Sequence, residues 1–272
     1  MEIAKRKLSQ YRCCGYSFLR GCFSQVEIDT VLRELPAIFS QDQPGRILEK
    51  GSKIVRSIYG AHTSNRVLHC LANQQRIVHT ATKILGGDVY IHQFKINVKA
   101  AFNGDIWPWH QDFIYWMHED GMLQPQATTA AIFLDEVNEF NGPLLLVPCS
   151  HRAGVIEGPA RGGAALTGMV GADLKYTVPP DCVAKLVSEH GIVAPKGPAG
   201  SVLFFHCNLV HGSAPNMSPF DRRIVYVTFN SVGNRLAPQS DPRPDFLASR
   251  NFEPISAVSE TALQSWETQR TS

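Results

Sequence analysis

The chain has 272 residues, of which 44% are hydrophobic and 18% are charged, and these proportions exclude a mainly disordered protein. Its net charge of +2 comes without a long basic run, which argues against nucleic acid or a membrane surface as a partner. No apolar segment approaches the roughly 20 residues of a membrane span or forms a signal-peptide core, so we expect a cytoplasmic protein.

Two helices are expected in the first third of the chain. Ser24-Gln-Val-Glu27 has the form of a capping box, and the apolar spacing after it predicts a helix over residues 25–35 that ends at Pro36. Asn65 can cap a second, longer helix, and Gly86-Gly87 can end it.

After these helices the pattern changes to short apolar stretches that are typical of β-strands. Residues 89–97 alternate, so Gln93, Lys95 and Asn97 should share one face of a strand and His92 should point to the other. Further strands are expected over residues 127–134, 144–147, 201–206 and 223–230.

Short strands between loops rich in Gly and Pro are typical of a sandwich or jelly roll. Residues 151–180 have the composition of a long loop, which in a compact domain often carries function, and 181–190 should form a short helix. We therefore expect one domain, with a helical N-terminal part (about 1–87), a jelly-roll core (about 88–232) and a C-terminal tail (233–272).

The most informative stretch is Trp109-His-Gln-Asp-Phe113. On an extended chain the side chains of His110 and Asp112 point the same way. An imidazole and a carboxylate make two thirds of the 2-His-1-carboxylate set that is typical of non-haem Fe(II) oxygenases. The third ligand is then His206 or His211. His211 is favoured because small residues follow it at a loop mouth, whereas His206 is still within a strand.

A metal with three protein ligands keeps positions for a 2-oxo acid and for dioxygen, and the distal carboxylate of that acid needs a cation. Arg222 offers a planar fork for it, with the neighbouring Arg223 as the alternative. Lys95 lies between apolar residues of a core strand, so its ammonium needs an anion such as the oxo acid. The alternative is an edge-strand lysine that reaches water.

Several segments match a known family: Val55-Arg-Ser-Ile-Tyr59, Tyr90–Asn97, Trp109–Phe113, Glu119-Asp-Gly121, Phe140–Pro143, His211–Phe220 and Asp241-Pro-Arg-Pro244. With them the chain resembles, over nearly its whole length, the phytanoyl-CoA dioxygenase superfamily of Fe(II)/2-oxoglutarate oxygenases. It is most similar to the branch of ectoine hydroxylases and free L-leucine hydroxylases. The resemblance implies a mainly β fold with flanking helices, the double-stranded β-helix, which is a cupin-like jelly roll.

The resemblance also implies roles for single residues. It implies Fe(II) binding by His110, Asp112 and His211, and contacts to 2-oxoglutarate from Arg222, Lys95, Asn97, Thr129 and Ser213. Lys95 departs from the arginine of ectoine hydroxylases, so its contact would be a point charge. Arg243 falls where the substrate carboxylate is bound, and the implied pocket wall comprises Gln93, Trp116, Tyr59, His62 and Val170.

The implied reaction is hydroxylation of an unactivated C–H bond, coupled to conversion of 2-oxoglutarate and O2 to succinate and carbon dioxide, with ascorbate helpful in vitro. The carboxylate of Asp112 favours hydroxylation, because halogenating relatives lack it. The first hypothesis for the substrate is a free aliphatic L-amino acid such as leucine, for a specialised metabolite or nonribosomal peptide. The alternatives are proline, pipecolate or ectoine as substrate and, in a different class, a catalytically silent jelly roll that binds a metal or ligand.

Overall fold

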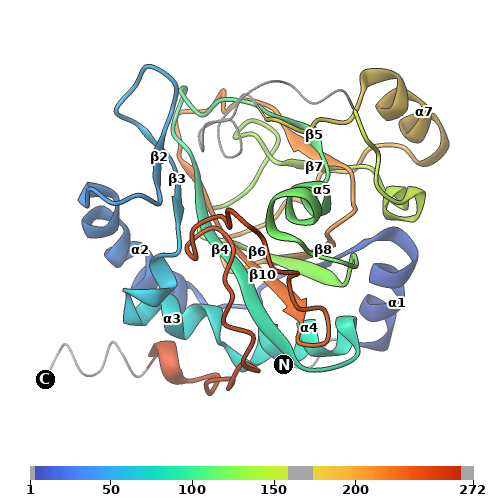
Figure 1. Cartoon of the computed structure of the whole chain (residues 1–272). Coiled ribbons are helices and arrows are strands. Elements are labelled where there is room, and N and C mark those ends of the chain that lie inside the picture. Colours follow the sequence, from blue (N-terminus) through green and yellow to red (C-terminus); the bar gives the residue numbers. More distant parts are fainter. Residues whose placement is uncertain (1–3, 159–173, 265–272) are drawn as a thin grey trace, which may run out of the picture.

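The computed structural model describes residues 4–158 and 174–264, which form two β-sheets flanked by helices (Figure 1). The major sheet has the strand order β1-β8-β6-β10-β4-β3-β2, the minor sheet has the order β5-β9-β7, and all pairings within them are antiparallel. The strands of the major sheet are β1 (Tyr16–Leu19), β2 (Arg46–Leu48), β3 (Val55–Tyr59), β4 (Val89–Lys99), β6 (Ala127–Phe133), β8 (Val202–His206) and β10 (Arg222–Ser231). Those of the minor sheet are β5 (Trp107–His110), β7 (Leu144–Leu146) and β9 (His211–Ser213). The expected mainly β jelly-roll class is confirmed.

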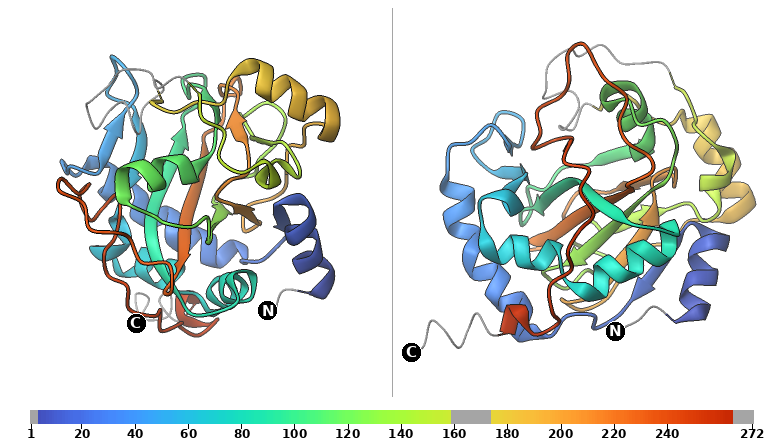
Figure 2. Two further views of the ribbon diagram at one scale, coloured as in Figure 1. Left: turned by 45° about the vertical axis from the view of Figure 1, so that its right-hand side comes forward. Right: turned by 60° about the horizontal axis from the view of Figure 1, so that its bottom comes forward.

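Helices cover the outer face of the major sheet. The α-helices are α1 (Lys5–Cys14), α2 (Gln25–Ser40), α3 (Arg66–Ala72), α4 (Gln75–Leu85), α5 (Asp112–Tyr115) and α7 (Pro180–His190), and the short helical turns are η1 (Ala61–Thr63), η2 (Trp116–Asp120) and η3 (Ser150–Ala153). In the right-hand view of Figure 2, α2, α3 and α4 lie across the sheet. Their apolar side chains pack with Phe94, Ile96 and Val225 in the largest core cluster. None of the helices in the described ranges is long and apolar enough to cross a membrane.

The inner face of the major sheet turns toward the minor sheet. Phe133, Phe205 and Tyr226 of the major sheet form a second core cluster with Leu144 and Leu146 of β7. Because side chains alternate along a strand, the positions that share this face with Tyr226 point into the space between the sheets. That space holds the candidate site.

The helix predicted over residues 25–35 is longer than expected. Its capping box is present, with Ser24 and Glu27 bonded to each other's backbone N–H groups, but Pro36 lies inside α2, which continues to Ser40. A proline removes one backbone hydrogen bond without forbidding a further turn. That turn persists because Ile38 is buried in the outer core cluster, so tertiary packing overrides the local signal.

The long helix expected after Asn65 is divided into α3 and α4. Both predicted ends are confirmed, because the side chain of Asn65 caps α3 and Gly86 ends α4 with a left-handed backbone. The break between the two helices comes from the C-terminal tail. Val258 donates its N–H to the Asn73 carbonyl (2.8 Å) and accepts the N–H of Gln75 (3.0 Å). Groups that would continue a single helix therefore bond to a segment far away in sequence.

The strand at residues 89–97 is confirmed as part of β4, but its alternation is interrupted at one position. Consecutive residues of β10 pair with Gln93 and Ile91, so His92 is an extra residue in a β-bulge. A bulge redirects the side chains beside it. His92 was expected to point away from Gln93, but its ring packs edge-on against Trp116, at 5.1 Å between ring centroids.

The N-terminal part contains strands that the sequence analysis did not predict. β1 forms one edge of the major sheet, and β3 and β2 form the other. β3 pairs with β4 so that Ser57 lies opposite Asn97. Their short runs lack the alternation that marks β4, and their pairing partners are far away in sequence. The expected strands around residues 127–134, 144–147, 201–206 and 223–230 and the helix at 181–190 are confirmed within one residue at either end.

Candidate active site

Three residues that the sequence analysis chose as iron ligands come together at one end of the minor sheet. His110 ends β5, His211 begins β9, and the two strands pair so that these histidines lie opposite each other. The Oδ1 atom of Asp112 lies 3.7 Å from the Nε2 atom of His110 and 3.9 Å from that of His211. Among the residues that the structure describes, these three are the one group of His, Cys, Asp or Glu side chains arranged to hold a metal ion.

The two ligand atoms of the His-x-Asp motif converge by a route that differs from the expected strand. Asp112 is the first residue of α5, so only His110 belongs to a strand. Gln111 between them is extended, with φ −117° and ψ 138°. One extended residue is enough to turn both side chains to the same side.

The tautomers of both histidines follow from their backbone contacts. The Nδ1 atom of His110 lies 2.7 Å from the Pro108 carbonyl oxygen, and that of His211 lies 2.9 Å from the Leu209 carbonyl oxygen. A carbonyl oxygen only accepts hydrogen bonds, so each Nδ1 carries the hydrogen and each Nε2 keeps a free lone pair. This arrangement orients an imidazole for metal binding.

Charges at the three side chains also suit a metal ion. Burial and the neighbouring His211 lower the pKa of His110 to about 3, and burial lowers the pKa of His211. Burial alone would raise the pKa of Asp112, but opposing charges, of which the ammonium of Lys95 has the largest effect, outweigh it and hold that pKa below its usual value. Two neutral imidazoles and one carboxylate are the protonation states that a metal requires of its ligands.

Two adjoining hollows meet at these side chains. The first, which we call the β9 hollow, is lined by Lys95, Asn97, Trp107, His110, Leu144, Phe205, His211, Gly212, Ser213 and Tyr226. The second, which we call the tail hollow, is lined by Tyr59, Gln93, Lys95, Trp107, His110, Asp112, Tyr115, Trp116, Leu174 and Arg243.

The β9 hollow offers unpaired donors to an anion. The Ser213 Oγ atom is buried and has no hydrogen-bond partner among the described residues. The same holds for the Nε and Nη1 atoms of Arg222, which is not itself in the lining but lies on the inner face of β10, four positions before the lining residue Tyr226. Asn97 accepts a hydrogen bond from Ser57 (3.0 Å) through its side-chain oxygen, which leaves its amide N–H groups for the hollow. Unpaired buried donors of this kind fit a carboxylate.

The tail hollow contains four of the residues predicted for substrate: Arg243, Gln93, Trp116 and Tyr59. Gln93 donates its side-chain N–H to the Leu247 carbonyl oxygen (2.7 Å), which fixes the C-terminal tail beside β4. Arg243 lies in that tail and brings a guanidinium to the wall. The hollow thus combines the cationic groups of Arg243 and Lys95 with aromatic walls and the apolar side chain of Leu174.

Two other predicted residues, Thr129 and His62, do not line either hollow. Thr129 lies on the inner face of β6, but its hydroxyl is 3.0 Å from that of Thr228 and is buried. His62 stacks on Phe94 at 4.8 Å between ring centroids, and Phe94 belongs to the outer core cluster. His62 therefore lies on the opposite side of the major sheet. Val170 lies outside the described residues.

The two alternatives that the sequence left open lie elsewhere. His206 packs beside Tyr11 and His151, at 6.4 and 5.2 Å between ring centroids. Arg223 donates two hydrogen bonds to the carboxylate of Asp135 (2.8 and 2.6 Å), so its guanidinium is already paired. Neither side chain lines the hollows beside the triad.

Trp107 and Tyr226 are residues of the site that sequence reasoning missed. Trp107 lines both hollows, and Tyr226 lines the β9 hollow. A signal existed for Tyr226, because it shares a strand face with Arg222. Trp107 had no such signal, since an aromatic residue at a strand start is equally typical of a core.

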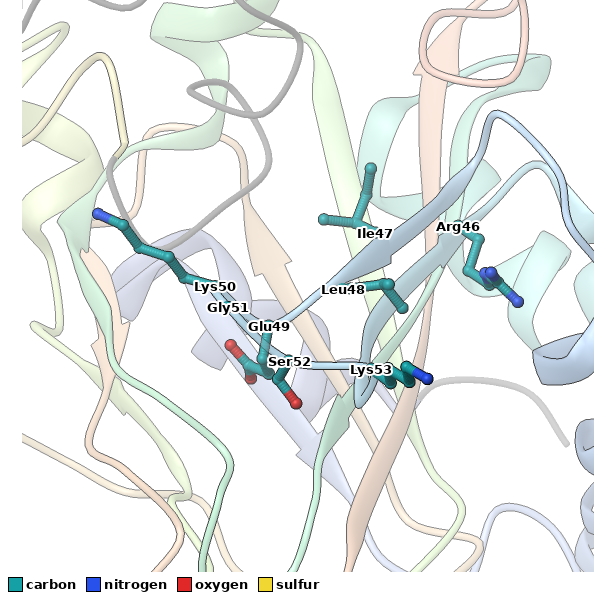
Figure 3. Close-up of a pocket in the computed structure, with 8 residues that line it drawn as sticks. All are labelled: Arg46, Ile47, Leu48, Glu49, Lys50, Gly51, Ser52 and Lys53. Carbon is teal, nitrogen blue, oxygen red and sulfur yellow. The ribbon is translucent and has the colours of Figure 1, made fainter.

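A further hollow lies on the surface at the hairpin between β2 and β3, lined by residues 46–53 (Figure 3). The carboxylate of Glu49 is bound to Arg56, at 2.9 Å. The side chains of Lys50 and Lys53 point away from each other (Figure 3). Its one carboxylate is thus already paired and its two lysines diverge, so the triad and its two hollows remain the candidate active site.

Comparison with known proteins agrees with this site. The model of the phytanoyl-CoA dioxygenase (PhyH) family matches residues 11–224. The chain belongs to this family. It is 38% identical over 248 residues to an L-proline trans-4-hydroxylase of Streptomyces griseoviridis, covering 90% of this chain and 92% of that protein. It is 37% identical over 261 residues to an ectoine dioxygenase of Bordetella parapertussis, covering 91% and 83%.

Solved structures extend the comparison to the cofactors. EctD from S. alaskensis, solved with bound Fe, matches with a TM-score of 0.81 and 32% identity over 94% of this chain and 88% of that chain. The same protein with 2-oxoglutarate and 5-hydroxyectoine matches equally well. Together with the His-Asp-His group, these matches show that this member of the PhyH family is an iron- and 2-oxoglutarate-dependent dioxygenase.

Proposed function

We propose that this dioxygenase hydroxylates a small free amino acid with an aliphatic side chain, and that leucine is its first candidate substrate. The observation that carries the proposal is the position of the triad between two hollows, each with a cationic group for a carboxylate. Lys95 lines both hollows and Arg243 lines the tail hollow, while Arg222 shares the face of β10 on which Tyr226 lines the β9 hollow.

We assign iron binding to His110, Asp112 and His211. The fit rests on two imidazoles with free Nε2 lone pairs and one ionised carboxylate, all buried. Such a donor set suits ferrous iron with open positions. When bound, iron with 2-oxoglutarate and O2 supplies the oxidising power to convert a C–H bond into C–OH, with release of succinate and carbon dioxide.

We assign the β9 hollow to 2-oxoglutarate. The unpaired Nε and Nη1 atoms of Arg222 support this assignment, because buried guanidinium N–H groups without an acceptor are costly until an anion binds. Lys95 adds a second positive charge at the boundary of the two hollows, where its ammonium lies 5.1 Å from the centre of the Tyr226 ring. At the β9 hollow, these side chains orient a dicarboxylate and neutralise its negative charge.

We assign the tail hollow to the amino-acid substrate. Arg243 is placed to receive the carboxylate, while Trp116, Tyr115 and Leu174 offer an apolar wall for an aliphatic side chain. The wall also excludes water from the reacting carbon, which favours turnover of the bound substrate over side reactions.

Proline is the second candidate, favoured by the proline 4-hydroxylase that is 38% identical to this chain. It carries the same carboxylate as leucine but a ring in place of a branched side chain. The two substrates would therefore share Arg243 and differ in their contacts with the apolar wall.

A panel of free amino acids tests the proposal. The purified protein is incubated with Fe(II), 2-oxoglutarate, ascorbate and leucine, proline, pipecolate or ectoine in turn, and the products are analysed by mass spectrometry. We expect a gain of one oxygen atom with leucine, matched by an equal amount of succinate. The absence of a hydroxylated product from every amino acid would contradict the proposal, and a product from proline alone would favour the second candidate.

A further inference from the structure

The Glu119-Asp-Gly121 segment is part of the family resemblance, but its residues are not in the lining of either hollow. Its central residue, Asp120, is fully buried at the end of η2. Arg243 donates two hydrogen bonds to its carboxylate, from Nε to Oδ1 (2.7 Å) and from Nη2 to Oδ2 (2.7 Å). Arg243 lines the tail hollow, whereas Asp120 lies behind it.

This pairing fixes which edge of the guanidinium faces the hollow. A guanidinium has five N–H donors in one plane. Asp120 occupies the edge formed by Nε and one hydrogen of Nη2. The end of the fork, with Nη1 and the second hydrogen of Nη2, is left for another acceptor. That end can still bind a carboxylate with two hydrogen bonds.

A third residue lies against the carboxylate of Asp120. The Nε2 atom of His92 lies 3.1 Å from Oδ2 of Asp120, and both side chains are fully buried. His92 reaches this position because it is the extra residue of the β-bulge in β4. Burial would raise the pKa of Asp120, but its contacts with His92 and Arg243 outweigh burial and hold that pKa low. Asp120 is therefore an anion between two nitrogen groups.

The backbone of the tail is held at the same place. The N–H of Ser249 donates to the His92 carbonyl oxygen (2.8 Å), and the side chain of the adjacent Gln93 donates to the Leu247 carbonyl oxygen (2.7 Å). Arg250 donates to the carbonyl oxygen of Arg243 itself (3.0 Å). Strand, tail and the helical segment that begins at Asp112 thus meet around one carboxylate.

We propose that Asp120 is the positioning residue of the substrate site: with His92 behind it, it directs the guanidinium of Arg243 so that its free end receives the carboxylate of the amino acid. The proposal rests on the proposed function of Arg243. It adds that selection for a carboxylate depends on a residue that does not touch the substrate. It also links substrate binding to the segment that carries the iron ligand Asp112.

The variant Asp120→Asn tests this role. It keeps the shape of the side chain but removes its charge and one acceptor, so the guanidinium loses its two-point support. We expect the KM for the amino acid to rise about tenfold or more while the KM for 2-oxoglutarate stays within about twofold. Equal changes in both values, or no change in the KM for the amino acid, would overturn the proposal.

The chain offers a matched control in Asp135. Its carboxylate also accepts two hydrogen bonds from one guanidinium, that of Arg223 (2.8 and 2.6 Å), but the pair is not part of the lining of either hollow. Asp135→Asn should leave both KM values within about twofold. If it raised the KM for the amino acid as much as Asp120→Asn does, the effect would be a general loss of an ion pair, and the proposal would fail.

A double-mutant cycle separates positioning from independent binding. In the background of Arg243→Gln, Asp120→Asn should add less than about twofold to the KM for the amino acid, because the group that it positions is gone. Multiplicative effects of the two changes would show that Asp120 acts without Arg243. If Asp120→Asn does not fold, Asp120→Glu keeps the charge but moves it by one methylene. The same rise in the KM for the amino acid is then expected, and an unchanged KM overturns the proposal.

A crystal structure of the Asp120→Asn variant gives a readout that needs no turnover. We expect the Arg243 guanidinium to turn away from its present direction at the wall of the tail hollow. An unmoved guanidinium would overturn the positioning role even in an active enzyme. If instead the guanidinium moves but the unchanged protein hydroxylates no free amino acid, the proposed function fails and the positioning of Arg243 by Asp120 stands.

Discussion

The guanidinium carbon of Arg56 lies 3.9 Å from the centre of the Trp107 ring. Arg56 is almost completely buried and also donates to Glu49 (2.9 Å) and to the Ile106 carbonyl oxygen (2.8 Å). Trp107 lines both hollows, so a residue of β3 supports the wall that the two hollows share. A planar cation suits this position because it stacks on a ring and bonds in its own plane.

Replacement of Arg56 by Lys should therefore weaken both ligand sites. Lysine keeps the charge but loses the stacked plane and one of the two hydrogen bonds, at a cost of about 1–2 kcal/mol in the free energy of unfolding. We expect the KM values for 2-oxoglutarate and for the amino acid to rise together, by about threefold to tenfold. Steady-state kinetics and urea unfolding measure both effects. Arg46→Lys is the control, since Arg46 pairs with the exposed Asp42 and should change stability by less than about 0.5 kcal/mol.

Replacement of His110 by Ala should abolish iron-dependent turnover of 2-oxoglutarate. One of two neutral imidazoles is lost, and the remaining His211 and Asp112 leave the metal with an incomplete set of ligands. Succinate release and the iron content after dialysis measure the effect. His206→Ala is the control, because it removes the histidine that does not line the hollows, and it should keep most of the turnover. If His206→Ala lost its iron while His110→Ala kept it, His206 and not His110 would be the iron ligand.

Substitution of the neighbours Arg222 and Arg223 should have different effects, one on the KM for 2-oxoglutarate and the other on the free energy of unfolding. Arg222→Lys replaces a fork with a point charge and should raise the KM for 2-oxoglutarate by about tenfold or more. Arg223→Lys should leave that KM nearly unchanged and lower the free energy of unfolding by about 1 kcal/mol, because its two bonds to Asp135 are partly exposed. Equal KM values for the two variants would contradict the assignment of Arg222.

His62 should make the protein less stable in mild acid. Burial lowers its pKa from 6.5 to about 4, so the folded state stays neutral at a pH at which the unfolded state takes up a proton. A folded-state pKa below the unfolded value makes stability fall as pH falls from about 6.5 to about 4, by on the order of 1 kcal/mol between pH 7 and pH 5. Urea unfolding at these two pH values should show a smaller difference in His62→Phe. An unchanged difference would contradict the pKa shift.

The fold was predictable where the signals are local. The cap at Asn65, the stop at Gly86 and the strand β4, with its alternation outside the bulge at His92, each depend on a few neighbouring residues, and the structure contains all three. Prediction failed where distant segments decide. Val258 divides the helix after Asn65, and packing of Ile38 carries α2 past Pro36. No short stretch of sequence contains that information.

The candidate site was also predictable where the signal is local and not where distant segments decide. Alternation along one strand was enough to place Lys95 and Asn97 on the face that lines the β9 hollow. It was wrong for His92, because the bulge depends on how β4 pairs with β10. The pairing of Arg243 with Asp120 spans 123 positions of sequence and had no local signal.

Lys95, Trp107 and His110 line both hollows, so an occupant of either hollow contacts side chains that also line the other. In the proposed function, a ligand that shifts these shared side chains changes the affinity for the second ligand, and linkage requires the reverse effect to have the same factor. The shared wall is also an opportunity for inhibitor design. A single molecule with two carboxylates, one for Arg222 and one for Arg243, would occupy both hollows and gain from the high effective concentration of its second end.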